Sequence, residues 1–122
     1  MNIETFQDFC LALPGVTEEF PFGEETLVYK VCGKVFVLSH IDTFETMNLK
    51  ADPEDVTERQ ERYSGVHPAY HMNKKHWITV ETNGDVSTKL LLEWIKGSYD
   101  LVVSKLPQKD KAALQAKNPK SK

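Results

Sequence analysis

The strongest constraint on the fold is a run of two-residue alternation that extends from Leu27 to Lys50. Leu27, Tyr29 and Val31 occupy every second position at its start, and successive side chains of a β-strand point to opposite faces of a sheet. Cys32-Gly33 then marks a tight turn. The pattern predicts strands over 27–31, 35–41 and 44–50, in an antiparallel meander with one face toward water.

Two further segments have strand character. Residues 16–22 alternate until Gly23, and residues 77–81 form a short apolar run that Asn83-Gly84 closes. Residues 66–75, which contain a His-Pro pair, are predicted as a loop. The sheet is therefore expected to gain one strand before the meander and one after it.

Helical periodicity marks the first and second helices. Asn2 is placed to cap a helix, whose apolar residues form one stripe: Ile3, Phe6, Phe9, Cys10 and Leu13. Asp52-Pro53, with Asp55 at the capping-box position, predicts a second helix that is strongly polar and ends near 64–65.

A long third helix is predicted from about Ser87, with Leu90 and Leu101 flanking an apolar face made by Leu91, Trp94, Ile95 and Val102. Gly97 within it indicates a close contact between helix and sheet. Pro107 ends this helix, and residues 109–116 are predicted as a last short one.

The predicted order α-ββββ-α-β-α-α indicates a single α+β domain, in which helices pack on one face of an antiparallel sheet. The expected core candidates are Leu27, Val37, Ile78, Trp94 and Ile95. Residues 1–117 are assigned to this domain. Residues 118–122 contain no apolar side chain and are expected to form a disordered tail.

Composition narrows the functional classes. The chain has 122 residues, 40% hydrophobic and 27% charged, which is typical of one soluble domain. No apolar run approaches the roughly 20 residues of a membrane span, and residues 1–13 lack the basic start of a signal peptide. Cys10 and Cys32 have no zinc or redox spacing, so both are expected to be free thiols in a cytoplasmic protein.

Charge is distributed unevenly along the chain. Residues 1–66 hold 13 acidic and 5 basic residues, whereas residues 67–122 hold 5 acidic and 10 basic residues. Such a division is consistent with a basic face for a polyanion. The alternative is an uneven spread of charge that has no partner.

The segment "AYHMNKKHW", residues 69–77, is the densest in groups that contact ligands. Lys74 and Lys75 can meet phosphates as point charges. Stacking on bases is assigned to Tyr70 and Trp77, and the other polar candidates are His71, Asn73 and His76. Strand alternation opposite Ile78 and Val80 predicts that Trp77 is at least partly exposed.

The competing interpretation of this segment is a structural loop, in which a histidine bonds backbone carbonyls and Trp77 begins a buried strand. Lys34 and Lys50 are added as candidate phosphate contacts, with Lys30 nearby, on the expected outer face of the meander. Lysines on exposed strands also protect sheet edges from aggregation, and this alternative stays open.

Catalytic and metal-binding patterns are absent from the sequence. His67 and His71 are four residues apart, but Pro68 lies between them and no cysteine is near, so zinc is not predicted. No nucleophile has a matched base, and no phosphate-binding loop or dinucleotide motif occurs. We therefore expect a binding protein without a cofactor, rather than an enzyme.

Five segments together resemble the MmcQ/YjbR family, and they occur in the same order over about residues 3–107: FCLALPGVTEEFPFG, LVYKVCGKVFVL, MNLKADPE, YHMNKKHW and SYDLVVSKLP. The resemblance implies a compact α+β domain of the frataxin-like, or CyaY-like, type. It also implies the DNA-binding label that the family carries, which rests on a double-wing arrangement. It implies no catalytic residue and no cofactor.

The leading hypothesis is a monomeric cytoplasmic module that binds nucleic acid, with DNA as the first candidate and RNA as the second, and no membrane partner. The alternative is a small-molecule or protein-binding module that uses the 67–77 loop as a pocket wall. Convergence of the lysines on one convex face favours the first hypothesis. A ring of Tyr70, His71, His76 and Trp77 around a concavity favours the second.

Overall fold

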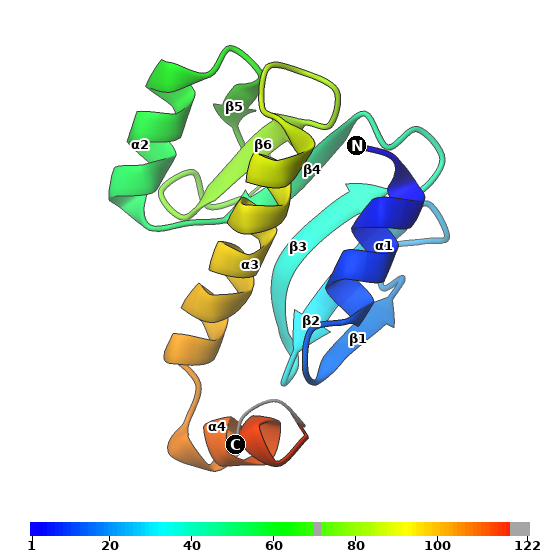
Figure 1. Cartoon of the computed structure of the whole chain (residues 1–122), viewed down its shortest axis with the longest axis vertical. Helices are drawn as coiled ribbons and strands as arrows, with labels where there is room; N and C mark the ends of the chain where they lie inside the picture. Colours follow the sequence, from blue (N-terminus) through cyan, green and yellow to red (C-terminus); the bar gives the residue numbers. More distant parts are fainter. Residues whose placement is uncertain (70–71, 118–122) are drawn as a thin grey trace.

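The computed structural model describes residues 1–69 and 72–117 and shows a six-stranded antiparallel sheet with four helices (Figure 1). The elements are α1 (Ile3–Leu11), β1 (Val16–Glu19), β2 (Thr26–Val31), β3 (Lys34–His40), β4 (Thr46–Lys50), α2 (Pro53–Arg62), β5 (Val66–Pro68), β6 (Trp77–Glu81), α3 (Thr88–Ser104) and α4 (Gln108–Lys117). The strand order across the sheet is β1-β2-β3-β4-β6-β5. The predicted α+β class is confirmed.

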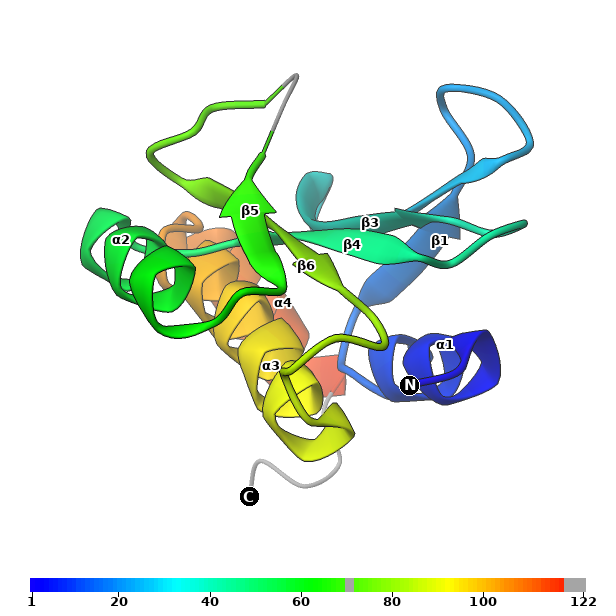
Figure 2. The same ribbon diagram turned by 90° about the horizontal axis from the view of Figure 1, so that it is seen from above.

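Helices α1 and α3 cover one face of the sheet, as predicted (Figure 2). Asn2 begins α1 by accepting a 2.8 Å hydrogen bond from the Thr5 amide, and Ser87 caps α3 through the Leu90 amide at 3.2 Å. Both caps satisfy amides that the first helical turn leaves without partners. The two helices therefore begin where their sequence signals predict.

The core lies between these helices and the sheet. All five predicted core residues are buried: Leu27, Val37, Ile78, Trp94 and Ile95. Phe6 of α1 is fully buried, and its ring centroid lies 5.5 Å from that of Tyr29 and 5.1 Å from that of Phe44. Aromatic side chains from a helix, a strand and a loop thus form one cluster that attaches α1 to the sheet.

The predicted turn at Cys32-Gly33 is confirmed. Both residues have positive φ, 49° and 77°, as expected for the two central residues of a type I′ hairpin turn. A bulge between Tyr29 and Lys30 shifts the register of the β2–β3 pair next to this turn. The hairpin consequently places Lys30 opposite Val35 and Val31 opposite Lys34.

Several boundaries differ from the sequence-based expectation. Residues 66–68, predicted as loop, form the edge strand β5, because a three-residue strand ending in proline lacks the length that alternation requires. The first strand stops at Glu19 rather than Phe22, and the fourth begins at Thr46 rather than Phe44.

The predicted start of α2 is confirmed, because Asp52 is the N-cap residue and Pro53 takes the first helical position, although the Asp52 side chain makes no capping hydrogen bond. One local prediction about a helix was wrong. A side chain at Gly97 would meet open space within 4 Å, so this glycine marks no close contact with the sheet. The close contact in α3 is instead polar, because the Ser98 hydroxyl donates to the Lys50 carbonyl at 2.6 Å.

Helix α4 packs against the end of the molecule where α1 turns into β1. Gly15, at φ 72°, lies under Leu114, and a Cβ atom there would come within 2.3 Å of the leucine side chain. Leu114 is itself buried. The tail predicted over 118–122 lies outside the described residues.

Candidate functional site: the open face of the sheet

The face of the sheet opposite α1 and α3 carries a second, separate set of side chains. In Figure 2 the described helices lie below or beside the sheet, and none covers its upper face. We call this surface the open face. Strand register arranges its side chains in rows that cross the sheet.

The middle row crosses all six strands: Glu19, Val28, Leu38, Asn48, Thr79 and His67. Within this row the Thr79 hydroxyl donates to the Asn48 Oδ1 atom at 2.6 Å. Val28 is fully buried although it lies on the open face. The row therefore changes from apolar beside β2 to polar beside β6.

One end of the open face is basic. Lys30 is register-paired with Val35, and Lys50 with Trp77. Val37 pairs with Leu49, so Lys50 lies in line with this same end of β3. The connection that carries Lys74 and Lys75 enters β6 here, because the Ala51 amide donates to the His76 carbonyl at 2.8 Å.

The lysines of this end have different environments. Lys74 and Lys75 are exposed and Lys50 is partly exposed. Lys30 forms an ion pair with Glu19 at 3.2 Å, and the hydrogen bond from Lys30 lowers the pKa of Glu19 below its ordinary value. Lys30 would therefore have to exchange a carboxylate for any phosphate that it binds.

The opposite end of the open face is built around a histidine–glutamate pair. The His67 Nε2 atom of β5 lies 2.6 Å from the Glu81 Oε2 atom of β6, and both side chains are nearly half exposed. Beside them is a hollow of about 470 Å³ lined by Glu45, Thr46, His67, Glu81 and Asn83. This end is therefore acidic and could hold a small polar group.

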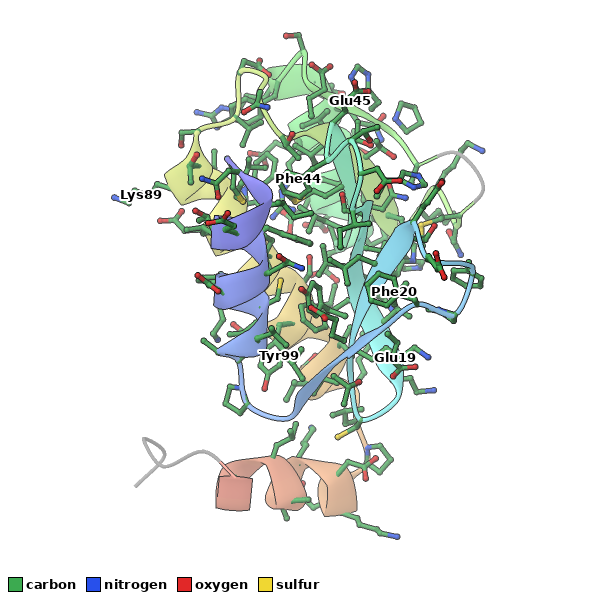
Figure 3. The ribbon with its side chains drawn as sticks, turned by 90° about the vertical axis from the view of Figure 1, so that its right-hand side faces the viewer. Glu19, Phe20, Phe44, Glu45, Lys89 and Tyr99 are labelled. Carbon is green, nitrogen blue, oxygen red and sulfur yellow. The ribbon has the colours of Figure 1, made fainter. Side chains whose placement is uncertain are left out.

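Two loops border the open face and rise above it in Figure 2. One joins β5 to β6. The other joins β1 to β2, and it carries Phe20 and Phe22, with exposed fractions of 42% and 75%. Figure 3 shows Phe20 directly after Glu19, at the start of this second loop. The open face is thus bordered by one loop that carries Lys74 and Lys75 and by another that carries Phe20 and Phe22.

The structure separates the predicted site residues. Lys50, Lys74 and Lys75 lie at the same end of the sheet, but Lys34 is register-paired with the helix-facing Val31 and is exposed at the hairpin tip. Lys34 therefore does not belong to the open face, because the bulge reverses the phase of β3. Tyr70 and His71 lie outside the described residues.

Three candidate residues of the segment 69–77 contribute to the structure of the protein itself. Trp77 is on the open face, as its phase predicts, but it is only 9% exposed, so the prediction of partial exposure was wrong. The Asn73 Oδ1 atom accepts a hydrogen bond from the Lys75 amide at 2.9 Å, which shapes the turn. His76, partly buried, contributes its backbone to the junction with β4.

Sequence reasoning missed Phe20 and Phe22 as candidate contacts, because both were assigned to a strand that ends earlier. It also missed the His67–Glu81 pair, since β5 was not recognised. No group of three His, Cys, Asp or Glu side chains within 1–69 and 72–117 could hold a metal ion. No helix in the same part of the chain is long and apolar enough to cross a membrane.

The predicted thiol environments are confirmed. Cys10 is buried and Cys32 is exposed, and neither is disulfide-bonded. Burial raises the pKa of the Cys10 thiol far above its ordinary value, with a smaller contribution from Glu18. Neither cysteine belongs to the open face.

Comparison with known proteins places this architecture in a family. Residues 11–101 match the family model described as YjbR. The chain belongs to the YjbR family. YbdF of Escherichia coli O157:H7, an uncharacterized protein, is 42% identical over 108 residues, which cover 88% of each chain. YjbR of Escherichia coli K12, also uncharacterized, is 26% identical over 115 residues, 93% of this chain and 98% of that protein.

Solved YjbR-type structures share the fold. The crystal structure of Deinococcus radiodurans protein DR2400 aligns with a TM-score of 0.84 at 38% identity, and it covers 93% of this chain and 87% of its own. A crystal structure from Pseudomonas syringae aligns with a TM-score of 0.70 at 28% identity, covering 83% and 98%. The family assignment made from five sequence segments is therefore confirmed, whereas the frataxin-like label stays a prediction.

Proposed function

We propose that the open face binds single-stranded nucleic acid, with the phosphate backbone along its basic end and bases against the exposed phenylalanines. Proteins that hold single strands combine a positively charged groove with aromatic side chains on which bases stack. The observation that supports this proposal is that the open face carries Lys50 at its basic end, beside the loop with Lys74 and Lys75, and is also bordered by the loop with the exposed Phe20 and Phe22.

The shape of the surface favours a single strand over a duplex. The open face is a sheet surface that the β1–β2 loop borders and rises above (Figure 2), so unpaired bases can reach it, whereas this loop would hold a rigid duplex away from the sheet. Because Trp77 is buried, the aromatic side chain that we propose for stacking is Phe22, which is 75% exposed. The chain carries a net charge of -3, so we expect weak binding, with Kd about 10⁻⁴ to 10⁻⁶ M at physiological salt.

The test is a fluorescence anisotropy titration of a labelled oligothymidine at several salt concentrations, with a matched RNA and a duplex as comparisons. If four phosphates are neutralised, log K should fall with log salt with a slope of about -2.8 for a single strand. The four lysines concerned are Lys30, Lys50, Lys74 and Lys75. The double substitution Lys74→Ala/Lys75→Ala should reduce the magnitude of this slope by about 1.4.

Two further variants separate the contribution of stacking from that of ionic contacts and control for positions outside the site. Phe22→Ala should weaken binding about tenfold without changing the salt slope, because a stacking contact is not ionic. Lys89→Ala, on α3 and away from the open face (Figure 3), is the matched control and should change nothing. Absence of binding at the lowest salt, or equal effects of Lys89→Ala and Lys74→Ala/Lys75→Ala, would reject the proposal.

The hollow beside His67 and Glu81 favours a second candidate function, namely binding of a small polar molecule at the acidic end. Small-molecule sites are concave and carry a few placed polar groups. This candidate is tested if oligonucleotides fail to bind. Small molecules that bind the hollow should shift the His67 ring resonances in NMR spectra. The substitution Glu81→Gln should alter these resonances in the free protein and abolish the binding of those small molecules.

A further inference from the structure

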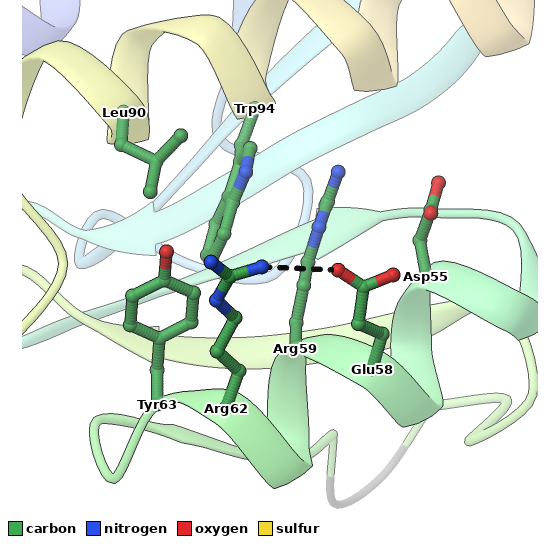
Figure 4. Close-up of a pocket in the computed structure, with 7 residues that line it drawn as sticks. All are labelled: Asp55, Glu58, Arg59, Arg62, Tyr63, Leu90 and Trp94. Atoms are coloured by element: carbon green, nitrogen blue, oxygen red, sulfur yellow. Dashed lines mark ion pairs between the residues drawn. The ribbon is translucent and has the colours of Figure 1, made fainter.

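A second concave site lies between α2 and α3, away from the open face. Its volume is about 220 Å³, and Figure 4 shows its side chains converging from the two helices: Asp55, Glu58, Arg59, Arg62, Tyr63, Leu90 and Trp94. Positions 55, 58, 59 and 62 of α2 follow helical spacing, so one helix face presents all four charges.

Arg59 is the central group of this site. Its guanidinium carbon lies 4.3 Å from the centroid of the Trp94 ring, and the Tyr63 ring meets the same tryptophan edge-on at 5.4 Å. Trp94 is only 8% exposed. The stack therefore holds the guanidinium in a fixed plane, because a cation over an indole face is attracted to the ring.

The stack leaves hydrogen-bonding capacity unused. The Arg59 Nη1 atom is buried and has no hydrogen-bond partner among the described residues, although a guanidinium carries five N–H donors in its plane. Within the described residues, no carboxylate forms an ion pair with Arg59. Burial lowers the pKa of Arg59, and the carboxylates of Asp55 and Glu58 oppose that shift.

A purely structural role explains only part of this arrangement. If Arg59 served just to cover Trp94, the ring face and the aliphatic stem would account for the contact. Such a cover does not explain why a buried donor is left without an acceptor, which is an unfavourable state in a folded protein. An anionic oxygen in the pocket would meet the part of Arg59 that lines the cavity, beside this buried atom.

The surrounding charges restrict which anion fits. Arg62 adds a second cation and is ion-paired to Glu58 at 3.6 Å, and Asp55 adds a second carboxylate. Two cations and two carboxylates leave the pocket without net charge. A phosphate dianion would be repelled by the acids, whereas a ligand with one carboxylate and one ammonium group meets both sets of charges.

We propose that this pocket binds a free α-amino acid, with its carboxylate on Arg59 and Arg62 and its ammonium group toward Asp55 and Glu58. Leu90 supplies an apolar wall, and a volume of about 220 Å³, smaller than that of a drug-sized site, restricts the ligand to a small molecule such as leucine. The proposal goes beyond nucleic-acid binding and uses none of the open-face residues.

The test follows the two indole N–H resonances of the full chain by NMR while L-leucine is added, since the protein has two tryptophans. The Trp94 signal should shift and saturate with a Kd of about 1 mM, which is typical of so small a ligand. The Trp77 signal should not move. N-acetylleucine, which lacks the ammonium group, should bind about tenfold more weakly.

Two more ligands complete the chemistry. Leucinamide, which lacks the carboxylate, and inorganic phosphate should leave the Trp94 signal unchanged at the same concentrations. Equal affinity for leucine and N-acetylleucine, or a phosphate response as strong as the leucine response, would overturn the assignment. Failure of leucine to shift the Trp94 signal at about ten times the expected Kd would overturn it as well.

Variants of both charge types test the geometry. Arg59→Lys keeps a cation but loses the planar fork, and it should weaken leucine binding about tenfold. Asp55→Asn leaves the Arg59–Trp94 stack in place and should raise the Kd for leucine without changing that for N-acetylleucine. Lys96→Gln removes another cation that lies over an aromatic ring, 5.6 Å from the Tyr99 centroid, and should have no effect. Wild-type affinity in both Arg59→Lys and Asp55→Asn would refute the proposal.

Discussion

Strand β4 shows how differently the two faces of one sheet are used. Met47 and Leu49 point toward the helices and are buried in the core, whereas Thr46, Asn48 and Lys50 point the other way and stay partly exposed. The same alternation holds on β6, except that Trp77 is buried on the open side. The helix-covered face therefore holds most of the buried side chains of these two strands, whereas the open face keeps most of its side chains partly exposed.

The largest expected effect is on the covered face. Phe6→Ala should lower the free energy of unfolding by about 3–5 kcal/mol, because this fully buried ring contacts both Tyr29 and Phe44. Urea denaturation measures the loss. The control Lys89→Ala, at an exposed helix position, should stay within about 0.5 kcal/mol of wild type. If Phe6→Ala and Lys89→Ala had equal free energies of unfolding, the helix-covered face would contribute no more to stability than an exposed position does.

Trp77→Ala tests the exception on the open face. A side chain that is 9% exposed should cost about 3 kcal/mol or more on truncation, although it lies on the open face. The same urea experiment applies, with Lys50→Ala, at the register-paired position on β4, as the neighbouring control. A loss below about 1 kcal/mol would mean that Trp77 is accessible and available to a ligand.

A smaller effect is expected at the edge of the sheet. Asp85 accepts 2.8 Å hydrogen bonds from the Gly65 and Ser64 amides, and the Gly65 amide is the largest contribution to the lowered pKa of its carboxyl. The lowered pKa stabilises the folded state above the ordinary aspartate pKa of about 3.9, and this contribution disappears as pH falls through the lowered value.

Melting temperature against pH measures this contribution. Between about pH 5 and pH 2 the wild type should lose stability more steeply than Asp85→Asn. Above that range the melting temperatures of the two proteins should change with pH in parallel. Parallel curves throughout would show that Asp85 does not hold the α2–β5 connection in solution.

The smallest expected effect leaves stability unchanged. Under native conditions one thiol should react rapidly with a bulky disulfide reagent, namely Cys32 at the exposed turn, while Cys10 is protected. The raised pKa of Cys10 further suppresses its reactive thiolate form. Mass spectrometry of labelled peptides assigns the sites, and rapid labelling of Cys10 would indicate that α1 detaches readily.

The parts of the fold that sequence could predict are those with a repeated local signal. Alternation from Leu27 to Val31 and the apolar stripe through Phe6 and Cys10 both arise from periodicities that a single element displays by itself. The turn at Cys32-Gly33 has an equally local cause. These elements were predicted within one or two residues, apart from the outer strand that ended early.

The missing parts depend on contacts between distant segments. Strand β5 is only three residues long, so its identity comes from pairing with β6 rather than from its own pattern. The face of the sheet on which Lys34 lies is decided by a β-bulge, and no residue type in the sequence predicted that bulge. Burial of Trp77 and stacking of Arg59 on Trp94 likewise require the folded arrangement, which explains why the site could be predicted only in part.

The most direct test of the central claim is an amide NMR titration of the full chain with unlabelled oligothymidine at low salt. If the open face is the binding face, shifts should concentrate at residues 28–30, 48–50, 74–75 and 79 and along the β1–β2 loop. The amides of α1 and the exposed side of α3, including Lys89, should stay in place. Shifts that cluster on the helices instead, with residues 48–50 unmoved, would contradict the assignment of function to the open face.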